Sequence, residues 1–323
     1  MKTKIKVYKK PRLKKPILIA AWPGMGNVAL KAAIYLKDKL NAQEFASIDS
    51  ETFFYPQEAF VEQGIVAKPW FPKGRFYFWK DKRGESDLVI FICEAQPGFE
   101  KGYIYAKELL SLAEEFNIGR IFTFAAMPVA IDHLAAPNVW AAATEKTIAE
   151  WFNNQGIKMM KAGEISGMNG LLLAVAKEKG LNGCCLLGEV PLYTIQIENP
   201  KASMAVLETL SKLLGFEIDF QDLRKQAKFI EDEIEKLLDY LKISGEAQEP
   251  IGEEEIERIK KSLESYTKLP ESAKARVEEL FEQTKKDLSK AKELKTELDK
   301  WNIYKEYEDR FLDLFKKKEK RDN

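Results

Sequence analysis

Histidine, cysteine and long apolar runs are all scarce in this chain of 323 residues, and each scarcity excludes a class of function. His133 is the only histidine, so the sequence offers neither a set of zinc ligands nor a complete histidine-dependent nucleophile system, and we expect no metal site. The cysteines are Cys93, Cys184 and Cys185. An odd count that includes an adjacent pair is not the disulfide framework of a secreted protein, and all three lie in apolar runs, so we expect buried, reduced thiols.

No apolar stretch approaches the roughly 18 residues of a membrane-spanning helix. The basic N-terminus is followed by an apolar run, residues 17–22, that is too short for the core of a signal peptide. We therefore expect a cytoplasmic protein without a membrane partner. Its 51 basic and 51 acidic residues cancel to a net charge of zero, so no global charge points to nucleic acid either.

The density of charge divides the chain near residue 220. Residues 221–323 contain 24 basic and 27 acidic residues, or 51 charged residues in 103, whereas residues 1–220 contain 27 and 24, or 51 in 220. The apolar spacing changes at the same place. We expect a basic N-terminal arm over residues 1–15, an α/β core domain over 16–220 and a helical region over 221–323.

In the core, short continuous apolar runs alternate with segments of helical spacing. Such runs are typical of strands buried on both faces, and their alternation with helices predicts a mostly parallel sheet between helical layers. The segment 45–80 interrupts this rhythm; its turn at Pro72, Lys73 and Gly74 predicts a hairpin that extends the sheet with antiparallel strands. Our first interpretation of its aromatic residues is that they belong to the hydrophobic core. The alternatives are a protein interface and a stacking surface for nucleic acid. The expected strands are 17–22, 87–93, 120–127 and 183–190, and the expected helices are 27–40, 103–117, 144–155, 167–180 and 203–215.

Beyond residue 220 apolar residues recur at intervals of three and four, in narrow stripes between charged residues. This pattern predicts antiparallel helical hairpins or a short coiled coil, because a narrow stripe needs a partner helix. The stripes run over residues 223–241, 256–266, 277–301 and 304–314.

One loop fits a variant of the dinucleotide-binding fingerprint. Gly24, Gly26 and Ala29 follow an expected strand and precede an expected helix with the spacing G-x-G-x-x-A. The alternative is that the glycines only turn the chain and that Asn27 caps the helix.

Two carboxylates stand at the ends of expected strands, where open α/β sheets bind their ligands. Glu94 follows one strand and Glu189 ends another. They could do acid–base chemistry if burial raised their pKa values, or each could cap a loop or pair with a lysine.

Three stretches in combination resemble the proteasome assembly chaperone family, in its archaeal and bacterial branch: WPGMGNVALKAA at 22–33, ISGMNGLLL at 165–173 and LLGEVPLYTIQIENPKASMAVLETL at 186–210. The resemblance implies a three-layer α/β/α fold similar to nucleoside phosphorylases, without an established catalytic centre. It also implies binding to proteasome subunits or to other copies of the chain. Some relatives end in a hydrophobic residue, a tyrosine and one last residue; this chain ends in Lys320, Arg321, Asp322 and Asn323, so we expect any proteasome contact to use another surface.

The resemblance also selects loops that would contact a partner or ligand. An alternative for Asn169 and Gly170 is that they only cap a helix. The selected residues are Trp22, Gly24, Met25, Gly26, Asn27, Gly167, Met168, Asn169, Gly170 and Glu189.

We therefore predict a protein-binding, assembly-chaperone-like module without catalytic residues or a cofactor. It would self-associate as a homo-oligomer through its α/β core and bind other protein chains, either proteasome subunits or a homologous chaperone. The alternative is a nucleotide- or nucleoside-binding enzyme, ligase-like or phosphorylase-like, with its site at the C-terminal edge of the sheet near Gly26, Glu94 and Glu189.

Overall fold

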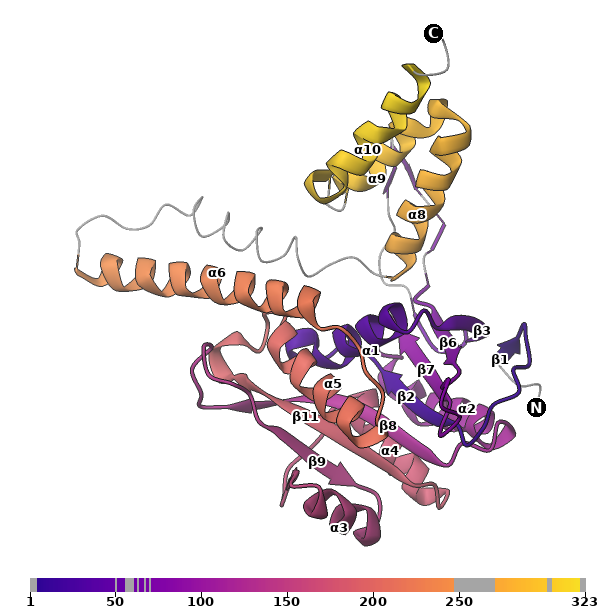
Figure 1. Cartoon of the computed structure of the whole chain (residues 1–323), viewed down its shortest axis with the longest axis vertical. Coiled ribbons are helices and arrows are strands. Elements are labelled where there is room, and N and C mark those ends of the chain that lie inside the picture. Colours follow the sequence, from indigo (N-terminus) through magenta and orange to yellow (C-terminus); the bar gives the residue numbers. More distant parts are fainter. Residues whose placement is uncertain are drawn as a thin grey trace. The chain divides into compact units, whose positions relative to one another are not determined.

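The computed structural model describes residues 5–49, 51–55, 61–62, 64–66, 68–69, 71–246, 271–300 and 304–319. The chain divides into two compact units, Met1–Ile234 and Glu235–Asn323. The first unit contains a nine-stranded sheet in the order β1-β3-β6-β7-β2-β8-β11-β9-β10 (Figure 1). Its strands are β1 (Ile5–Val7), β2 (Ile17–Ala21), β3 (Gln43–Ile48), β6 (Gly74–Trp79), β7 (Leu88–Cys93), β8 (Arg120–Val129), β9 (Val139–Ala143), β10 (Lys158–Met159) and β11 (Gly183–Pro191).

The centre of this mixed sheet is parallel. Neighbours β7, β2, β8 and β11 all run in the same direction, as the buried apolar runs predict. Antiparallel pairs flank this centre, β6 beside β7 on one side and β9 beside β11 on the other. The α/β fold class expected from the sequence is confirmed.

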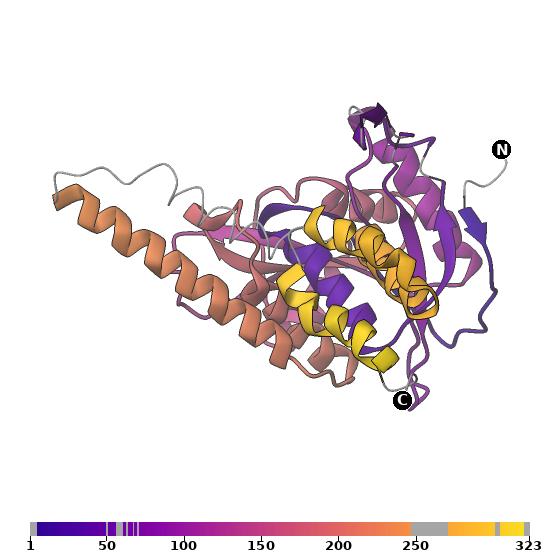
Figure 2. The same ribbon diagram turned by 90° about the horizontal axis from the view of Figure 1, so that it is seen from above.

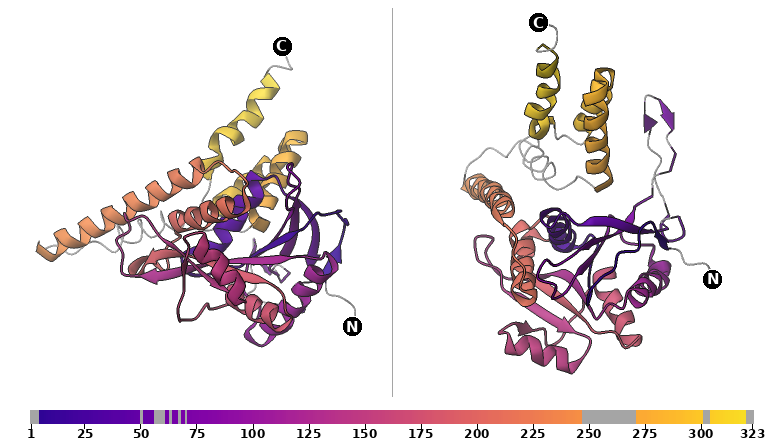
Figure 3. Two further views of the ribbon diagram at one scale, coloured as in Figure 1. Left: turned by 60° about the horizontal axis from the view of Figure 1, so that its bottom comes forward. Right: turned by 45° about the vertical axis from the view of Figure 1, so that its right-hand side comes forward.

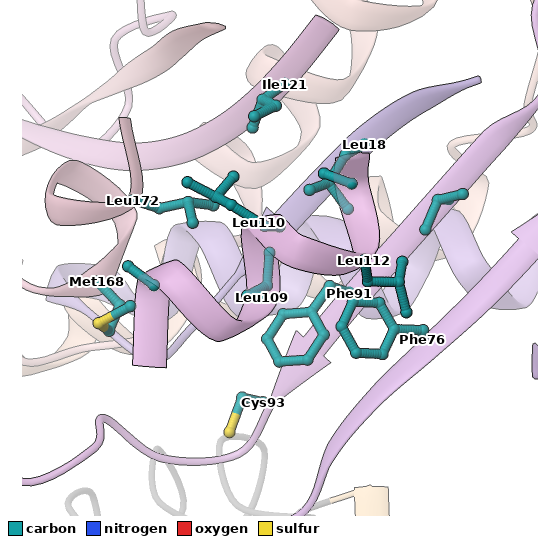
Figure 4. Close-up of a cluster of buried hydrophobic side chains, with 14 of the residues drawn as sticks. Leu18, Phe76, Phe91, Cys93, Leu109, Leu110, Leu112, Ile121, Met168 and Leu172 are labelled. Atoms are coloured by element: carbon teal, nitrogen blue, oxygen red, sulfur yellow. The ribbon is translucent and has the colours of Figure 1, made fainter. Parts of the chain in front are cut away.

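Helices cover both faces of the sheet. Alternate residues of β2 face opposite ways: Leu18 and Ala20 belong to one core, and Ile17, Ile19 and Ala21 to the other. Helices α2 (Gly102–Glu115) and α4 (Met168–Glu178) close the first core (Figure 4), and α1 (Val28–Lys39) and α5 (Pro200–Leu214) close the second. The right-hand view of Figure 3 shows these pairs on opposite sides of the sheet. The result is the expected three-layer α/β/α arrangement.

The hairpin expected around Pro72, Lys73 and Gly74 is wrong. Strand β6 begins at Gly74 and pairs antiparallel with β3 and β7, so the predicted antiparallel extension exists but its turn lies elsewhere. Only glycine fits at this first position of the strand, because a Cβ there would collide with Ile48, Phe91 and Tyr105. A separate two-stranded hairpin, β4 (Val61–Glu62) with β5 (Ile65–Val66), lies within the same segment.

The aromatic residues of β6 are core residues. Phe76, Tyr77 and Phe78 are buried, with Phe76 and Phe78 in one core and Tyr77 in the other. This confirms the first of the three alternatives for these aromatic side chains.

Strands β1, β9 and β10 and a short helix, α3 (Lys146–Asn154), complete the first unit. Its last helix is α6 (Gln221–Glu246), the long orange helix in Figure 2. Helix α6 begins at the shift in charge density and passes from one unit into the other at residues 234 and 235. Its first half is attached to the core by Leu223, which is fully buried, and by an ion pair from Lys39 of α1 to Asp222. The expected stripe at 256–266 lies outside the described residues.

The second unit contains α8 (Glu271–Lys286), α9 (Ala291–Lys300) and α10 (Tyr304–Glu319). One apolar core, defined by Val277, Leu280, Phe281, Ala291, Leu294, Leu298 and Phe311, joins these three helices. Arg310 of α10 binds both carboxylate oxygens of Glu278 on α8 and stacks over the Phe281 ring at 4.1 Å. The all-α C-terminal region is therefore confirmed. None of the helices that the structure describes combines the length and the apolar character needed to cross a membrane.

Candidate functional site

Four loops meet at one edge of the sheet because the four central strands are parallel. They are residues 22–27 after β2, 94–101 after β7, 130–138 after β8 and 192–199 after β11, and residues 165–167 join them at the start of α4. We call these loops together the loop edge. The chain leaves β2 for a helix on one face and β7 for a helix on the other, and at such a switch point open α/β sheets bind their ligands.

Asn169 binds the first of these loops. Its side chain accepts a hydrogen bond from the Trp22 amide at 3.1 Å and donates one to the Trp22 carbonyl at 3.3 Å. Asn169 is buried in the first turns of α4, and the N-cap position belongs to Gly167, so the interpretation of Asn169 as a helix cap is wrong. The Asn169 side chain thus connects α4 to the loop after β2, and it supplies partners that the buried Trp22 backbone needs.

Gln96 joins the same loops, although no motif in the sequence predicts this role. Its amide group donates to the Pro23 carbonyl at 2.6 Å, and its carbonyl accepts from the Met168 amide at 2.9 Å. Gly167 has a φ of +70°, and a Cβ there would press on the Gln96 side chain. The chain therefore fills its own switch point with polar side chains.

Backbone amides of the loop that fits the dinucleotide-binding fingerprint already donate hydrogen bonds to carbonyls of the chain. Gly26 donates to the Ile195 carbonyl at 2.8 Å, Asn27 donates to the Gly24 carbonyl at 2.9 Å, and Val28 donates to the Met25 carbonyl. A dinucleotide site needs such amides free to approach a pyrophosphate. Asn27 occupies the N-cap position of α1 with a φ of +51°, but its side chain forms no capping hydrogen bond.

Gly170 is required by a close approach of the chain. A Cβ at this position would overlap the carbonyl of Ile165, so only glycine lets the loop cross the start of α4.

Glu189 is buried and holds the loop before β9. Its carboxylate accepts from the Asn138 amide at 2.9 Å, from Asn138 Nδ2 at 2.7 Å and from Trp140 Nε1 at 2.8 Å. Burial acts to raise the pKa of Glu189, but the hydrogen bonds from Trp140 and Asn138 and the nearby charge of Lys158 outweigh it and lower the pKa. Of the alternatives for this residue, the loop-capping role fits this geometry.

Glu94 lies apart from Glu189. Three strand-to-strand steps separate β7 from β11, which corresponds to about 14 Å at the spacing of a sheet. Glu94 accepts from the Lys73 amide at 3.4 Å. The two carboxylates therefore do not form one acid–base pair.

His133 is buried in the loop after β8. Its backbone amide donates to the Tyr193 hydroxyl at 2.9 Å, and its Nδ1 lies 3.0 Å from the same oxygen. Lys201 of α5 donates to the carbonyls of His133 and Leu134, so these contacts fix the loop on α5. Within the described ranges, no group of three or more His, Cys, Asp or Glu side chains could hold a metal ion.

Large apolar side chains are exposed along the loop edge and the adjoining start of α2. Phe99 is fully exposed, and more than a third of the surface of each of the others is accessible. Trp22, Met168 and Asn169, by contrast, are buried, so they shape the loops and cannot contact a partner directly. We call the exposed set the apolar edge: Met25, Phe99, Tyr103, Ile104, Leu134, Leu192 and Tyr193.

Comparison with known proteins gives consistent matches. The model of the PAC2 family matches residues 18–238. An uncharacterized protein of Methanocaldococcus jannaschii, MJ1210, is 29% identical over 230 residues, which are 70% of this chain and 84% of that protein.

Solved structures also resemble this chain. Pyrococcus furiosus PbaB, described as an archaeal proteasome activator, has a TM-score of 0.63 and 31% identity over 72% of this chain and 97% of its own. PbaA of the same organism, described as an archaeal homolog of proteasome-assembly chaperone, has a TM-score of 0.56 and 26% identity over 72% and 96%.

Proposed function

The chain belongs to the PAC2 family, and we propose that it is an assembly-chaperone-like module that binds other protein chains in the cytoplasm. In this proposal its α/β core associates with copies of itself, and its other partners are proteasome subunits or a homologous chaperone. The similarity to PbaB, an archaeal proteasome activator, and to PbaA, an archaeal homolog of proteasome-assembly chaperone, supports this choice of partner.

The apolar edge is the observation that carries the proposal. Monomeric soluble proteins rarely expose large contiguous apolar patches, and interface cores are enriched in aromatic residues and methionine. The loop order follows the strand order β7-β2-β8-β11, which arranges Phe99, Met25, Leu134 and Leu192 in sequence along one edge.

The hydrogen bonds beneath this surface support the same role. Asn169, Gln96 and Lys201 tie the loops to one another and to the helices, so the exposed side chains are presented on a fixed backbone. A surface that is already ordered loses less conformational entropy on association.

The nucleotide alternative lacks a comparable observation. Its loop amides donate to carbonyls of the chain, and its two carboxylates lie about three strand spacings apart. A nucleotide at about 100 times its Kd would stabilise the fold by ~2.7 kcal/mol, so thermal unfolding with ATP, GTP or adenosine tests this alternative directly. We expect no shift of the melting temperature.

Two binding measurements test the proposal itself. Light scattering after size-exclusion chromatography at micromolar concentration should give a mass that is a multiple of the 37.0 kDa chain. Purified archaeal proteasome core particles should sediment together with the protein. A monomer that sediments alone in the presence of core particles would overturn the proposal.

A further inference from the structure

A cleft of about 270 Å³ lies between α5 and the edge strand β10. The loop before β9 contributes Asn138, β10 contributes Lys158, and α5 contributes Glu208 and Lys212. No spacing in the sequence connects these residues, because they come from three elements that meet only in the fold.

Lys158 is held in place at one wall. Its ammonium lies 3.5 Å from Asn138 Oδ1 and 5.4 Å from the centroid of the Trp140 ring. Asn138 and Trp140 are themselves fixed by Glu189, which takes the side-chain donors of both. A buried carboxylate thus orients the two groups that position this cation.

Lys212 faces the same cleft from α5. Its side-chain ammonium has no hydrogen-bond or ion-pair partner among the residues that the structure describes. Its charge is therefore available to a group that enters the cleft.

The charges around the cleft leave an excess of one positive charge. The carboxylate of Glu208 lies 3.6 Å from Arg224 of α6, and Glu189 lies behind the wall with its three donors. Among the residues that line the cleft, Lys158 and Lys212 thus stand against Glu208 alone. One singly charged anionic group balances the set.

We propose that this cleft binds an aspartate or glutamate side chain from an acidic segment of a protein partner. The volume is near the lower end of the roughly 300–1,000 Å³ of sites for small organic ligands, and a carboxylate supplies the single negative charge. The proposal rests on the protein-binding function above and adds the chemistry of one contact. Lys158 and Lys212 are its binding residues, and Glu189 is a positioning residue.

Fluorescence anisotropy with labelled, end-capped hexaglutamate tests the proposal on the full-length protein at low ionic strength. Wild type should bind hexaglutamate and not the matched hexaglutamine peptide. Lys158→Gln and Lys212→Gln should each weaken binding roughly threefold or more. Lys146→Gln, on the exposed surface of α3, removes the same charge elsewhere and should bind like wild type.

A wild-type protein that does not bind hexaglutamate would overturn the proposal, and so would either of two further outcomes. In one, both cleft variants bind hexaglutamate as tightly as Lys146→Gln does, which means that the peptide contacts another surface. In the other, inorganic phosphate at equal ionic strength displaces the peptide completely, which assigns the cleft to a free small anion.

The solution mass of the wild-type protein, measured beside its binding of hexaglutamate, distinguishes a failure of this proposal from a failure of the proposed function. A wild-type oligomer that ignores hexaglutamate contradicts the cleft proposal alone. A monomer that ignores proteasome core particles but binds hexaglutamate through Lys158 and Lys212 contradicts the proposed function alone.

Discussion

Single polar side chains decide how the loops of this protein are arranged. Asn169 alone satisfies the buried backbone of Trp22, and Gln96 connects Pro23 to Met168. Asn169 and Gln96 position the loops and do not contact a partner themselves, since the surface offered to a partner consists of other, apolar residues. The stability of the loops should therefore depend on these amides.

Replacing Asn169 by alanine leaves a buried amide and a buried carbonyl of Trp22 without partners. We expect the free energy of unfolding to fall by about 1–3 kcal/mol, measured by urea denaturation. Asn153→Ala removes the same side chain at an exposed position of α3 and should change stability by less than about 0.5 kcal/mol. Equal losses in the two variants would contradict the role given to Asn169.

Glu189→Gln should make stability depend differently on pH. The folded-state pKa of Glu189 is lowered, so the ionised carboxylate contributes stability above its unfolded pKa of about 4.3, and the contribution is lost as the pH falls through the lower folded value. We expect the variant to be less stable by about 1–3 kcal/mol at pH 7, with a smaller difference below about pH 4. Urea denaturation at pH 7 and below about pH 4 measures this difference in the free energy of unfolding, with the exposed Glu150→Gln as control. A pH-independent difference would contradict this account.

The three cysteines should be inert in the folded protein. All are free and buried, as the sequence predicts, and burial raises the pKa of Cys93 to about 11 and that of Cys185 to about 12. The reactive thiolate is therefore scarce at pH 8, and a thiol reagent should label native protein far more slowly than protein in guanidinium chloride, where three thiols per chain should react. Rapid labelling of the native protein would show that the cores open readily.

At the scale of elements, apolar runs predicted the centre of the sheet and its helices because burial on both faces leaves a clear pattern. Strand β10 has only two residues and β1 only three, too few for any periodicity. The turn at Pro72 was misplaced because β3, the partner of β6, lies far back in the sequence.

The candidate site was less predictable than the fold. The glycine loops and Asn169 could be located from their motifs, but the hydrogen-bond partner of Asn169, the role of Gln96 and the cleft could not. Gln96 and Asn169 are 73 residues apart, and Lys158 and Lys212 are 54 apart. Only the tertiary fold brings such residues together.

The Gly170→Ala substitution tests how closely the loop that contains Ile165 approaches α4. Alanine there would collide with the Ile165 carbonyl, and the backbone would have to move. We expect a loss of about 1–3 kcal/mol or more in the free energy of unfolding, measured by urea denaturation. The matched control is Gly119→Ala, because a Cβ at Gly119 meets no atom within 4 Å. A neutral Gly170→Ala would show that the loop adapts easily.

At the scale of the whole molecule, the family match covers the α/β core and ends at residue 238. Helices α8, α9 and α10, with their own apolar core, lie beyond that match. Relatives such as PbaB are matched over almost their whole length by about 72% of this chain. The helices α8, α9 and α10 therefore lie outside the family match, and the central claim concerns the core alone.

The most direct test of that claim is the solution mass of the protein when the apolar edge is made polar. Phe99→Ser combined with Ile104→Ser alters two exposed residues near the start of α2, and Val7→Ser alters an exposed apolar residue on the far strand β1. Light scattering after size-exclusion chromatography should give an oligomer for wild type and Val7→Ser, and a mass shifted toward the 37.0 kDa monomer for the double variant. A wild-type mass of 37.0 kDa at micromolar concentration, or an oligomer unchanged by the double substitution, would contradict self-association through the apolar edge.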